Sequence, residues 1–85
     1  MQENKTSIEL KMVSLKQVIH HDYVDSVTLP TKAGEITVLP NHTALISALG
    51  AGTIRARAGG KELPFQIQGG FMEVTPDSRL VVLLS

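Results

Sequence analysis

Short runs in which apolar and polar residues alternate make up most of this chain, and no segment keeps apolar residues at helical spacing. In residues 8–13, Ile8, Leu10 and Met12 alternate with polar neighbours, which predicts a strand with one buried face. Comparable strands are expected at residues 17–20, 23–29, 35–39, 53–58, 63–67, 71–75 and 80–84, with a further apolar run at residues 44–49. The pattern predicts about eight or nine short strands in an all-β antiparallel sandwich or flattened barrel.

Glycine pairs and prolines predict the turns between these strands. A Gly-Gly pair can adopt the positive φ that tight turns require, and the first pair is a strong signal for a two-residue type I′ hairpin. One proline stops a strand, and another presets φ at the first central position of a turn. The structural turn residues expected on this basis are Pro40, Gly59, Gly60, Gly69, Gly70 and Pro76.

Other residues predict strand boundaries and edges. We expect a turn at His21 and Asp22, and the end of a strand at Pro30. Pro64 predicts an edge or a bulge, because proline cannot donate to a sheet ladder. The almost continuously apolar run at residues 80–84 should lie centrally or be covered on both faces. The buried row of the strand around Pro64 is expected to be Leu63, Phe65 and Ile67.

Length and composition limit the classes of function. The 85 residues predict a single domain spanning residues 1–85, with residues 1–6 frayed and no C-terminal helical domain. Eight basic and eight acidic residues cancel, so nucleic acid and anionic lipid are poor candidates as main partners. Cysteine is absent, which excludes disulfides and thiolate chemistry. No apolar stretch is long enough for a spanning helix or a Sec-type signal, so we expect a soluble chain without lipid insertion.

Few residues could form a chemical site. His20, His21, Asp22 and His42 are the candidate metal ligands, but neighbouring histidines on a strand point to opposite faces, and surface histidines are the preferred interpretation. The residue types of a nucleophilic triad occur without a G-x-S-x-G motif. The Gly-Gly pairs do not lead into a helix, so they are read as turns rather than phosphate loops. We therefore expect no catalytic, metal or cofactor-binding residues.

Charged residues leave two interpretations open. Arg55 and Arg57 lie two apart on one strand face, which is either a solvated face or a contact for a carboxylate-bearing partner. Glu35, directly after Gly34, is either an ordinary turn charge or a contact residue at a protruding tip.

The order of several motifs resembles the N-terminal β-domain of the epsilon subunit of F-type ATP synthases. The segments that carry the resemblance are GEITVLPNHTALISAL, GTIRARAGGKE and IQGGFMEVTPDSRLVVL, preceded by IELKMVSLKQVI and VDSVTLPTKAG. Together they cover roughly residues 7–84. The resemblance implies a sandwich of two sheets with about ten strands.

The chain departs from the family pattern at several positions. Asn41 stands where the family usually has glycine, and asparagine tolerates positive φ, so the turn can survive. Thr43 and Ala44 replace an Ala-Pro pair, and Gln68 replaces a serine. The family commonly adds a C-terminal helical hairpin, whereas this sequence ends at Ser85, so we expect no bound nucleotide.

The resemblance implies a non-catalytic subunit in the central stalk of a rotary ATP synthase. One face would bind the gamma subunit, and a loop end would rest on the polar loops of the c-ring, coupling proton- or sodium-driven rotation to ATP synthesis. The implied location is peripheral, on the cytoplasmic face of a bacterial inner membrane. The alternative is a stand-alone β-sandwich binding module unconnected to the rotor. The implied contact residues for the c-ring are Gly34, Glu35, Asn41 and His42.

Overall fold

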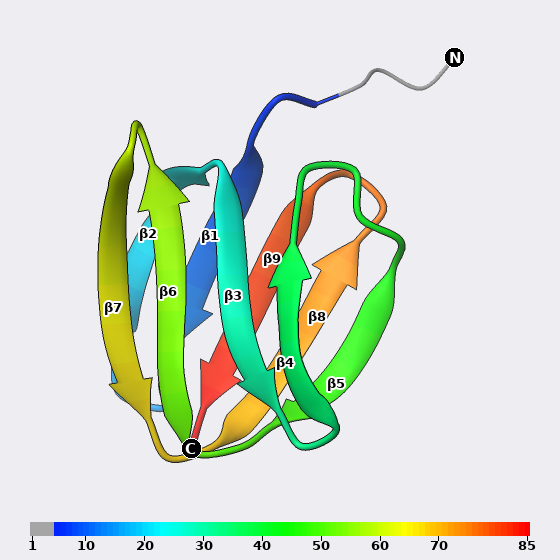
Figure 1. Cartoon of the computed structure of the whole chain (residues 1–85). Helices are drawn as coiled ribbons and strands as arrows, with labels where there is room; N and C mark the ends of the chain where they lie inside the picture. The colour runs from blue at the N-terminus through cyan, green and yellow to red at the C-terminus, as the bar shows by residue number, and fades with distance from the viewer. Residues whose placement is uncertain (1–4) are drawn as a thin grey trace.

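The chain folds into nine strands in the computed structural model, which describes residues 5–85 (Figure 1). Within these residues there is no helix that is long and apolar enough to cross a membrane. The strands are β1 (Ile8–Val13), β2 (Val18–Val24), β3 (Ser26–Thr31), β4 (Gly34–Val38), β5 (Leu45–Leu49), β6 (Gly52–Ala58), β7 (Lys61–Ile67), β8 (Gly70–Thr75) and β9 (Arg79–Leu84).

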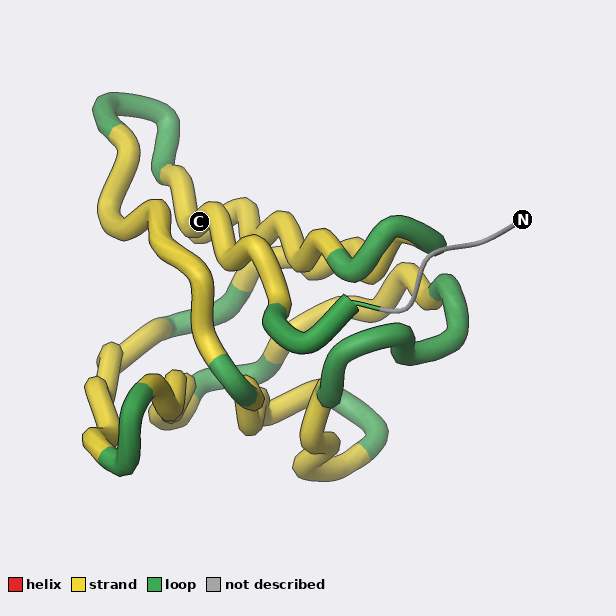
Figure 2. The backbone as a smooth tube through the Cα atoms, turned by 90° about the horizontal axis from the view of Figure 1, so that it is seen from above, coloured by secondary structure: helices red, strands yellow, loops and turns green. Residues whose placement is uncertain are grey.

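The strands form one curled sheet whose two halves lie face to face (Figures 1 and 2). One layer has the order β2-β1-β9-β8-β5, and the other contains β3, β6 and β7, with β4 paired to β3. The register between β3 and β5 joins the layers through a single pair, Thr31 and Leu49. The predicted sandwich or flattened barrel is therefore confirmed.

Two details of the predicted architecture are wrong. Residues 5–85 form nine strands, in agreement with the eight or nine that alternation predicts but fewer than the roughly ten that the resemblance implies. The sheet is mixed rather than antiparallel, because β1 runs parallel to β9, with Glu9 opposite Arg79 and Val13 opposite Leu83. The first and last of the nine strands thus lie side by side.

The predicted turn at His21 and Asp22 is also wrong, since both residues lie inside β2. His21 pairs with Lys11 and Asp22 with Leu10. Their polarity reflects the position of β2 at one end of the strand order, where most of its side chains are exposed. The chain turns instead at Asp25, whose carboxylate accepts a hydrogen bond from the Gly59 N–H at 3.0 Å.

Two of the four prolines, Pro30 and Pro64, lie within strands. Pro30 does not end a strand as predicted; it pairs with Glu35 inside β3, and its carbonyl accepts a hydrogen bond from the Gly50 N–H at 2.8 Å. Pro64 lies in β7, the strand at the other end of the order, as the sequence predicts. An edge strand tolerates proline because one of its sides needs no ladder donor.

The aliphatic core lies between the two layers. The inward rows of β1 and β9 meet there, with Leu10 opposite Leu80 and Met12 opposite Val82, all fully buried. Strand β9 is central, as predicted, between β1 and β8, but it is not covered on both faces because Leu83 is exposed. The buried apolar residues are Ile8, Leu10, Met12, Val24, Val27, Leu29, Val38, Leu49, Ile54, Ala56, Ile67, Met72, Val74, Leu80 and Val82.

The open side of the sandwich is closed by a side-chain contact between β2 and β7. The rings of His20 and Phe65 lie 5.2 Å apart, centroid to centroid. Of the predicted buried row in β7, Ile67 is buried and Phe65 half-buried, whereas Leu63 is exposed. The prediction for Leu63 is wrong, because its side chain lies at an edge strand and is 43% exposed.

The first Gly-Gly pair forms the predicted turn, whereas the second has positive φ without forming a tight turn. Gly59 and Gly60 join β6 to β7 with φ of 59° and 79°, as a type I′ hairpin requires. Gly69 connects β7 to β8, and Gly70 opens β8 with φ of 146°. A Cβ at Gly70 would lie only 2.1 Å from the carbonyl oxygen of Leu83, so this position also needs glycine for space.

Candidate functional site

A largely apolar face covers the outside of β5, β8 and β9, with the exposed Glu73 between Ile46 and Val81 as its charged residue. We define it by Ile46, Phe71, Val81 and Leu83. Ile46, Phe71 and Leu83 are 72%, 60% and 53% exposed. Phe71 is opposite Leu83 in the ladder between β8 and β9, so the two side chains share one face of the sheet. Large exposed apolar groups of this kind mark contact sites for other proteins.

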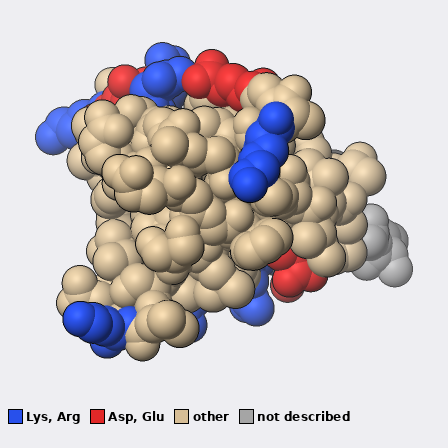
Figure 3. Space-filling view, turned by 90° about the horizontal axis from the view of Figure 1, so that it is seen from below, with Lys and Arg blue, Asp and Glu red and all other residues tan. Residues whose placement is uncertain are grey.

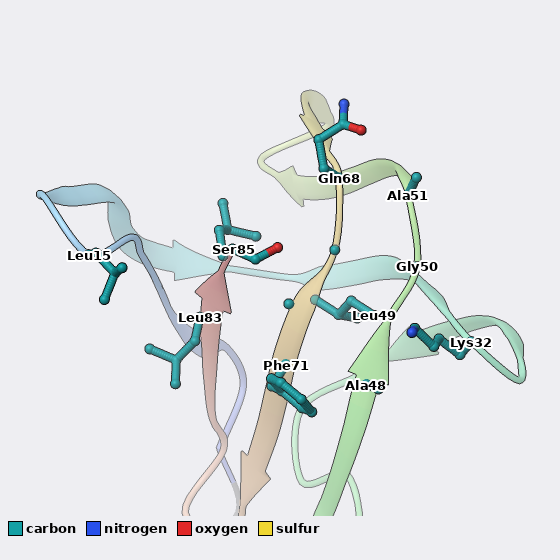
Figure 4. A pocket seen from close by; sticks show the side chains of 13 residues that line it. Leu15, Lys32, Ala48, Leu49, Gly50, Ala51, Gln68, Phe71, Leu83 and Ser85 are labelled. Atoms are coloured by element: carbon teal, nitrogen blue, oxygen red, sulfur yellow. The ribbon is translucent and has the colours of Figure 1, made fainter.

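A hollow of about 520 Å³ adjoins this face at the end of the sandwich where β3 meets β4 (Figure 4). Leu15, in the loop between β1 and β2, is fully exposed at its rim. Viewed from this end, most of the surface carries neither acidic nor basic side chains, and the charges lie mainly at the periphery (Figure 3). The lining residues include Leu15, Lys32, Ala48, Gln68, Phe71, Leu83 and Ser85.

The outer face of β4, β3, β6 and β7 is polar. Arg55 donates from its guanidinium to Glu35 at 3.0 Å, and Arg57 donates to Glu62 at 3.3 Å. The hydroxyls of Thr28 and Thr37 lie 3.0 Å apart. Of the two interpretations of the arginine pair, the structure favours the solvated face, because each arginine pairs with a carboxylate of its own chain.

Gly34 and Glu35 lie at the start of β4, next to the turn from β3. Gly34 has a φ of 127°, and its carbonyl accepts a hydrogen bond from the Thr31 hydroxyl. Both Gly34 and Glu35 are exposed, and the turn between β3 and β4 projects at the end of the sandwich (Figure 1). The geometry therefore presents Glu35 near a protruding end, as the sequence predicts for a contact residue.

Asn41 and His42 lie in the turn after β4. The Leu39 carbonyl accepts a hydrogen bond from the His42 N–H at 3.2 Å, and Asn41 has a φ of 65°. With Pro40 before Asn41, this is the signature of a type II turn. The predicted turn at Pro40 and the predicted positive φ at Asn41 are thus both confirmed.

The side chain of Asn41 is engaged within the chain. Its oxygen accepts from the Lys5 N–H at 3.0 Å, and its Nδ2 donates to the Lys5 carbonyl at 2.9 Å. Its backbone N–H donates to the Ser78 hydroxyl at 2.6 Å. Sequence reasoning missed these partners because Lys5 and Ser78 are 36 and 37 residues away. The one sequence signal for a structural role of Asn41 is that asparagine stands where the family usually has glycine.

The structure does not bring the four predicted ring-contact residues together. Gly34 and Glu35 stand at one end of β4, and Asn41 and His42 follow its other end (Figure 1). A strand of five residues spans roughly 17 Å. A single flat surface that meets the sandwich at its end can therefore contact one pair but not both.

The three histidines are separated from one another. His20 faces Phe65, whereas His21 lies 2.9 Å from Glu9 on the outer face, as expected for neighbours on a strand. The surface interpretation is wrong for His20, which is half-buried and whose Nε2 is shielded from solvent. His42 is bonded to the Thr43 carbonyl at 2.7 Å. Across residues 5–85, no group of three potential metal ligands comes together.

Glu9 joins β1 to its neighbours. Its carboxylate contacts His21 on β2 and accepts a hydrogen bond from Arg79 on β9 at 3.1 Å. The hydrogen bond with His21, followed by that with Arg79, lowers the pKa of Glu9. Glu9 in turn raises the pKa of Arg79. The cluster fixes the outer face of three strands and leaves Glu9 ionised.

Residues 7–84 match the family model described as the β-sandwich domain of the ATP synthase delta/epsilon chain. Among curated relatives, the ATP synthase epsilon chain of Desulforamulus reducens is 42% identical over 74 residues, covering 87% of this chain and 55% of the relative. That of Chloroflexus aggregans is 41% identical over 69 residues, covering 81% and 50%. The chain thus spans about half the length of the curated relatives it matches.

Solved structures show the same fold. A chain in the cryo-EM structure of OSCP, F1 and c-ring of the Euglena gracilis mitochondrial ATP synthase matches with a TM-score of 0.93 and 25% identity, over 98% of this chain and 53% of that one. A chain in the central stalk and c-ring structure of the Tetrahymena thermophila mitochondrial enzyme matches with a TM-score of 0.79 and 14% identity, over 98% and 66%.

Proposed function

Because residues 7–84 match its model, the chain belongs to the family of ATP synthase delta/epsilon chain β-sandwich domains, and we propose that it acts in the central stalk of a rotary F-type ATP synthase. Its role is mechanical and non-catalytic. It binds the gamma subunit on one face and the c-ring at one end, and so passes ion-driven rotation of the ring to the stalk. Its location is peripheral, on the cytoplasmic face of a bacterial inner membrane.

The exposed apolar face is the observation that carries this proposal. Phe71 and Leu83 on paired strands, with Ile46 beside them, present apolar surface that a stable partner would cover. The adjoining hollow can receive side chains from that partner. We assign this face to the gamma subunit, because a permanent contact within a rotor requires the larger apolar surface.

The end of the sandwich between β3 and β4 is the proposed contact with the c-ring. Glu35 projects there as a hydrogen-bond acceptor for polar groups of the ring loops. Gly34 and Glu35 are the first candidates because both are exposed beside a turn that projects from the end of the sandwich. Asn41 and His42 remain a second candidate pair, which a ring would reach only if it lay along β4 or at its opposite end.

Co-expression with the gamma subunit from the same genome tests the proposal. We expect the two chains to co-elute in size-exclusion chromatography at micromolar concentration. Elution of this chain alone would overturn the rotor assignment and favour the stand-alone binding module. A thermal-shift measurement with ATP is a further check: we expect no stabilisation, and a clear upward shift would indicate a nucleotide-responsive regulator instead.

A further inference from the structure

Arg55 bridges two strands that are not neighbours. It lies on β6, and its guanidinium reaches Glu35 on β4 at 3.0 Å. Strand β3 lies between them, with Thr28 opposite Arg55 on one side and Pro30 opposite Glu35 on the other. The arginine therefore crosses the outer face of β3 to hold a side chain of β4, which pairs with β3 alone among the described strands.

Arg57 provides a direct comparison on the same strand. Its side chain is 68% exposed and bonds Glu62 on the adjacent strand β7, whereas the side chain of Arg55 is 38% exposed. Arg55 also lies 4.0 Å from Glu62, so a second carboxylate is near its guanidinium, although the distance is too long for a hydrogen bond. Of the two arginines, only Arg55 contacts a residue of the proposed ring-contact end.

The contact uses one oxygen of Glu35 and leaves the other available. Arg55 donates to Oε2, and Oε1 has no hydrogen-bond partner within residues 5–85. A glutamate at the start of an edge strand would otherwise sample several rotamers. Fixing one of these rotamers on binding would lower the affinity roughly 2- to 10-fold. The Arg55 guanidinium fixes the Glu35 side chain before binding and also offsets the negative charge of its carboxylate.

We propose that Arg55 is a positioning residue, which holds Glu35 so that its Oε1 accepts a hydrogen bond from an uncharged N–H donor of the partner surface. This inference rests on the proposed function, since it takes that partner to be the c-ring. The donor is uncharged, because a second cation beside Arg55 would be repelled, and a carboxamide or a backbone amide meets this requirement. The contact should consequently depend little on salt, in contrast to an ion pair between partners.

Titration of purified c-rings with the complex of gamma and the full chain tests the inference. We expect Arg55→Ala to weaken ring binding roughly 2- to 10-fold. The matched control Arg57→Ala should change it less than about 2-fold, since Arg57 does not reach Glu35. The double variant Glu35→Gln/Arg55→Ala should bind no more weakly than Glu35→Gln alone, because Arg55 acts through Glu35. Arg55→Lys, which keeps a donor, should restore part of the loss.

Each of the following outcomes would overturn the inference. Equal effects of the two arginine variants would remove the special role of Arg55. Additive effects of Glu35→Gln and Arg55→Ala would show that Arg55 contacts the ring itself. A steep loss of wild-type binding between low and high salt would indicate an ion pair rather than an uncharged donor.

A separate readout distinguishes this inference from the proposed function. Retention of gamma by all variants, with unchanged thermal unfolding midpoints, shows that folding and the stalk contact are intact. Absence of ring binding by the wild-type complex would overturn the proposed ring contact and, with it, the role of Arg55. Wild-type binding that Arg55→Ala leaves unchanged would overturn the role of Arg55 alone.

Discussion

Hydrogen-bond partners decide which individual side chains can serve a partner. The amide of Asn41 is occupied by the Lys5 backbone, so it supports the turn rather than extending outward. Glu35 keeps one carboxylate oxygen without a partner within residues 5–85. The sequence predicted the backbone conformation of Asn41, because positive φ is a local property. It could not predict the partner, since Lys5 meets Asn41 only in the folded chain.

Single changes at the proposed contacts should have small effects. We expect Glu35→Ala to weaken ring binding by about 1 kcal/mol, the size of a typical interface truncation, because torque passes through several contacts. His42→Ala should weaken ring binding by a similar amount only if Asn41 and His42, the second candidate pair, contact the ring. Titration of the gamma complex with c-rings measures both. Loss of gamma binding in either variant would contradict the assignment, because gamma is placed on the apolar face.

Glu9 should make stability depend on pH. Its pKa is lowered in the folded chain by His21 and Arg79, so its stabilising contribution is complete above its ordinary pKa of 4.5 and is lost as the pH falls through the lowered value. Urea unfolding of wild type and Glu9→Gln should differ at pH 6 and converge at low acid pH. A difference that stays constant from pH 6 to pH 3 would contradict this role.

Alternation predicted the strands well and their boundaries less well. The inward row of β1 was predictable because its apolar residues recur at a period of two, whereas β9 is almost continuously apolar and its sequence does not show which row faces inward. The boundary between β2 and β3 was misplaced because β2 is an edge strand with exposed polar residues on both faces. When polar residues occupy both faces of a strand, the alternation of apolar and polar residues is lost, and the segment resembles a turn. The turn at Asp25 depends on Gly59, which is distant in sequence.

Two glycines at strand starts allow a matched comparison of strain and crowding. Both have positive φ, but a Cβ at Gly34 meets nothing within 4 Å, whereas at Gly70 it would meet the Leu83 carbonyl oxygen at 2.1 Å. We expect Gly34→Ala to cost about 1–3 kcal/mol of unfolding free energy from backbone strain. Gly70→Ala should cost roughly 1–3 kcal/mol more, because strands β8 and β9 must separate. Chemical denaturation measures both, and equal losses would contradict the crowding argument.

The order and direction of the strands in the sheet depend on contacts across the whole molecule. The sequence predicted a sandwich from the number and spacing of short strands, and the resemblance supported it. The parallel pairing of β1 with β9 could not be predicted, because alternation in each strand is the same for either direction of its neighbour. The separation of the two candidate contact pairs likewise follows from the direction of β4 across the sandwich.

The apolar face should be required for the stalk contact but not for folding. We expect Phe71→Asp/Leu83→Asp to abolish co-elution with gamma, because two buried charges at an interface core are costly. The domain should still fold, since both side chains are more than half exposed in the isolated chain, but two aspartates opposite each other in the ladder should lower the unfolding midpoint. Leu63→Asp, on the opposite layer, is the control and should retain gamma. Retention of gamma by the double variant would place the contact elsewhere.

Site-specific cross-linking in the complete ATP synthase tests the central claim most directly. The chain has no cysteine, so each introduced cysteine is unique in it. With a maleimide photo-cross-linker attached, Phe71→Cys is predicted to yield an adduct with the gamma subunit, and Glu35→Cys an adduct with subunit c. Absence of both adducts, or exchange of the two partners, would contradict a stalk domain that holds gamma on its apolar face and meets the ring between β3 and β4.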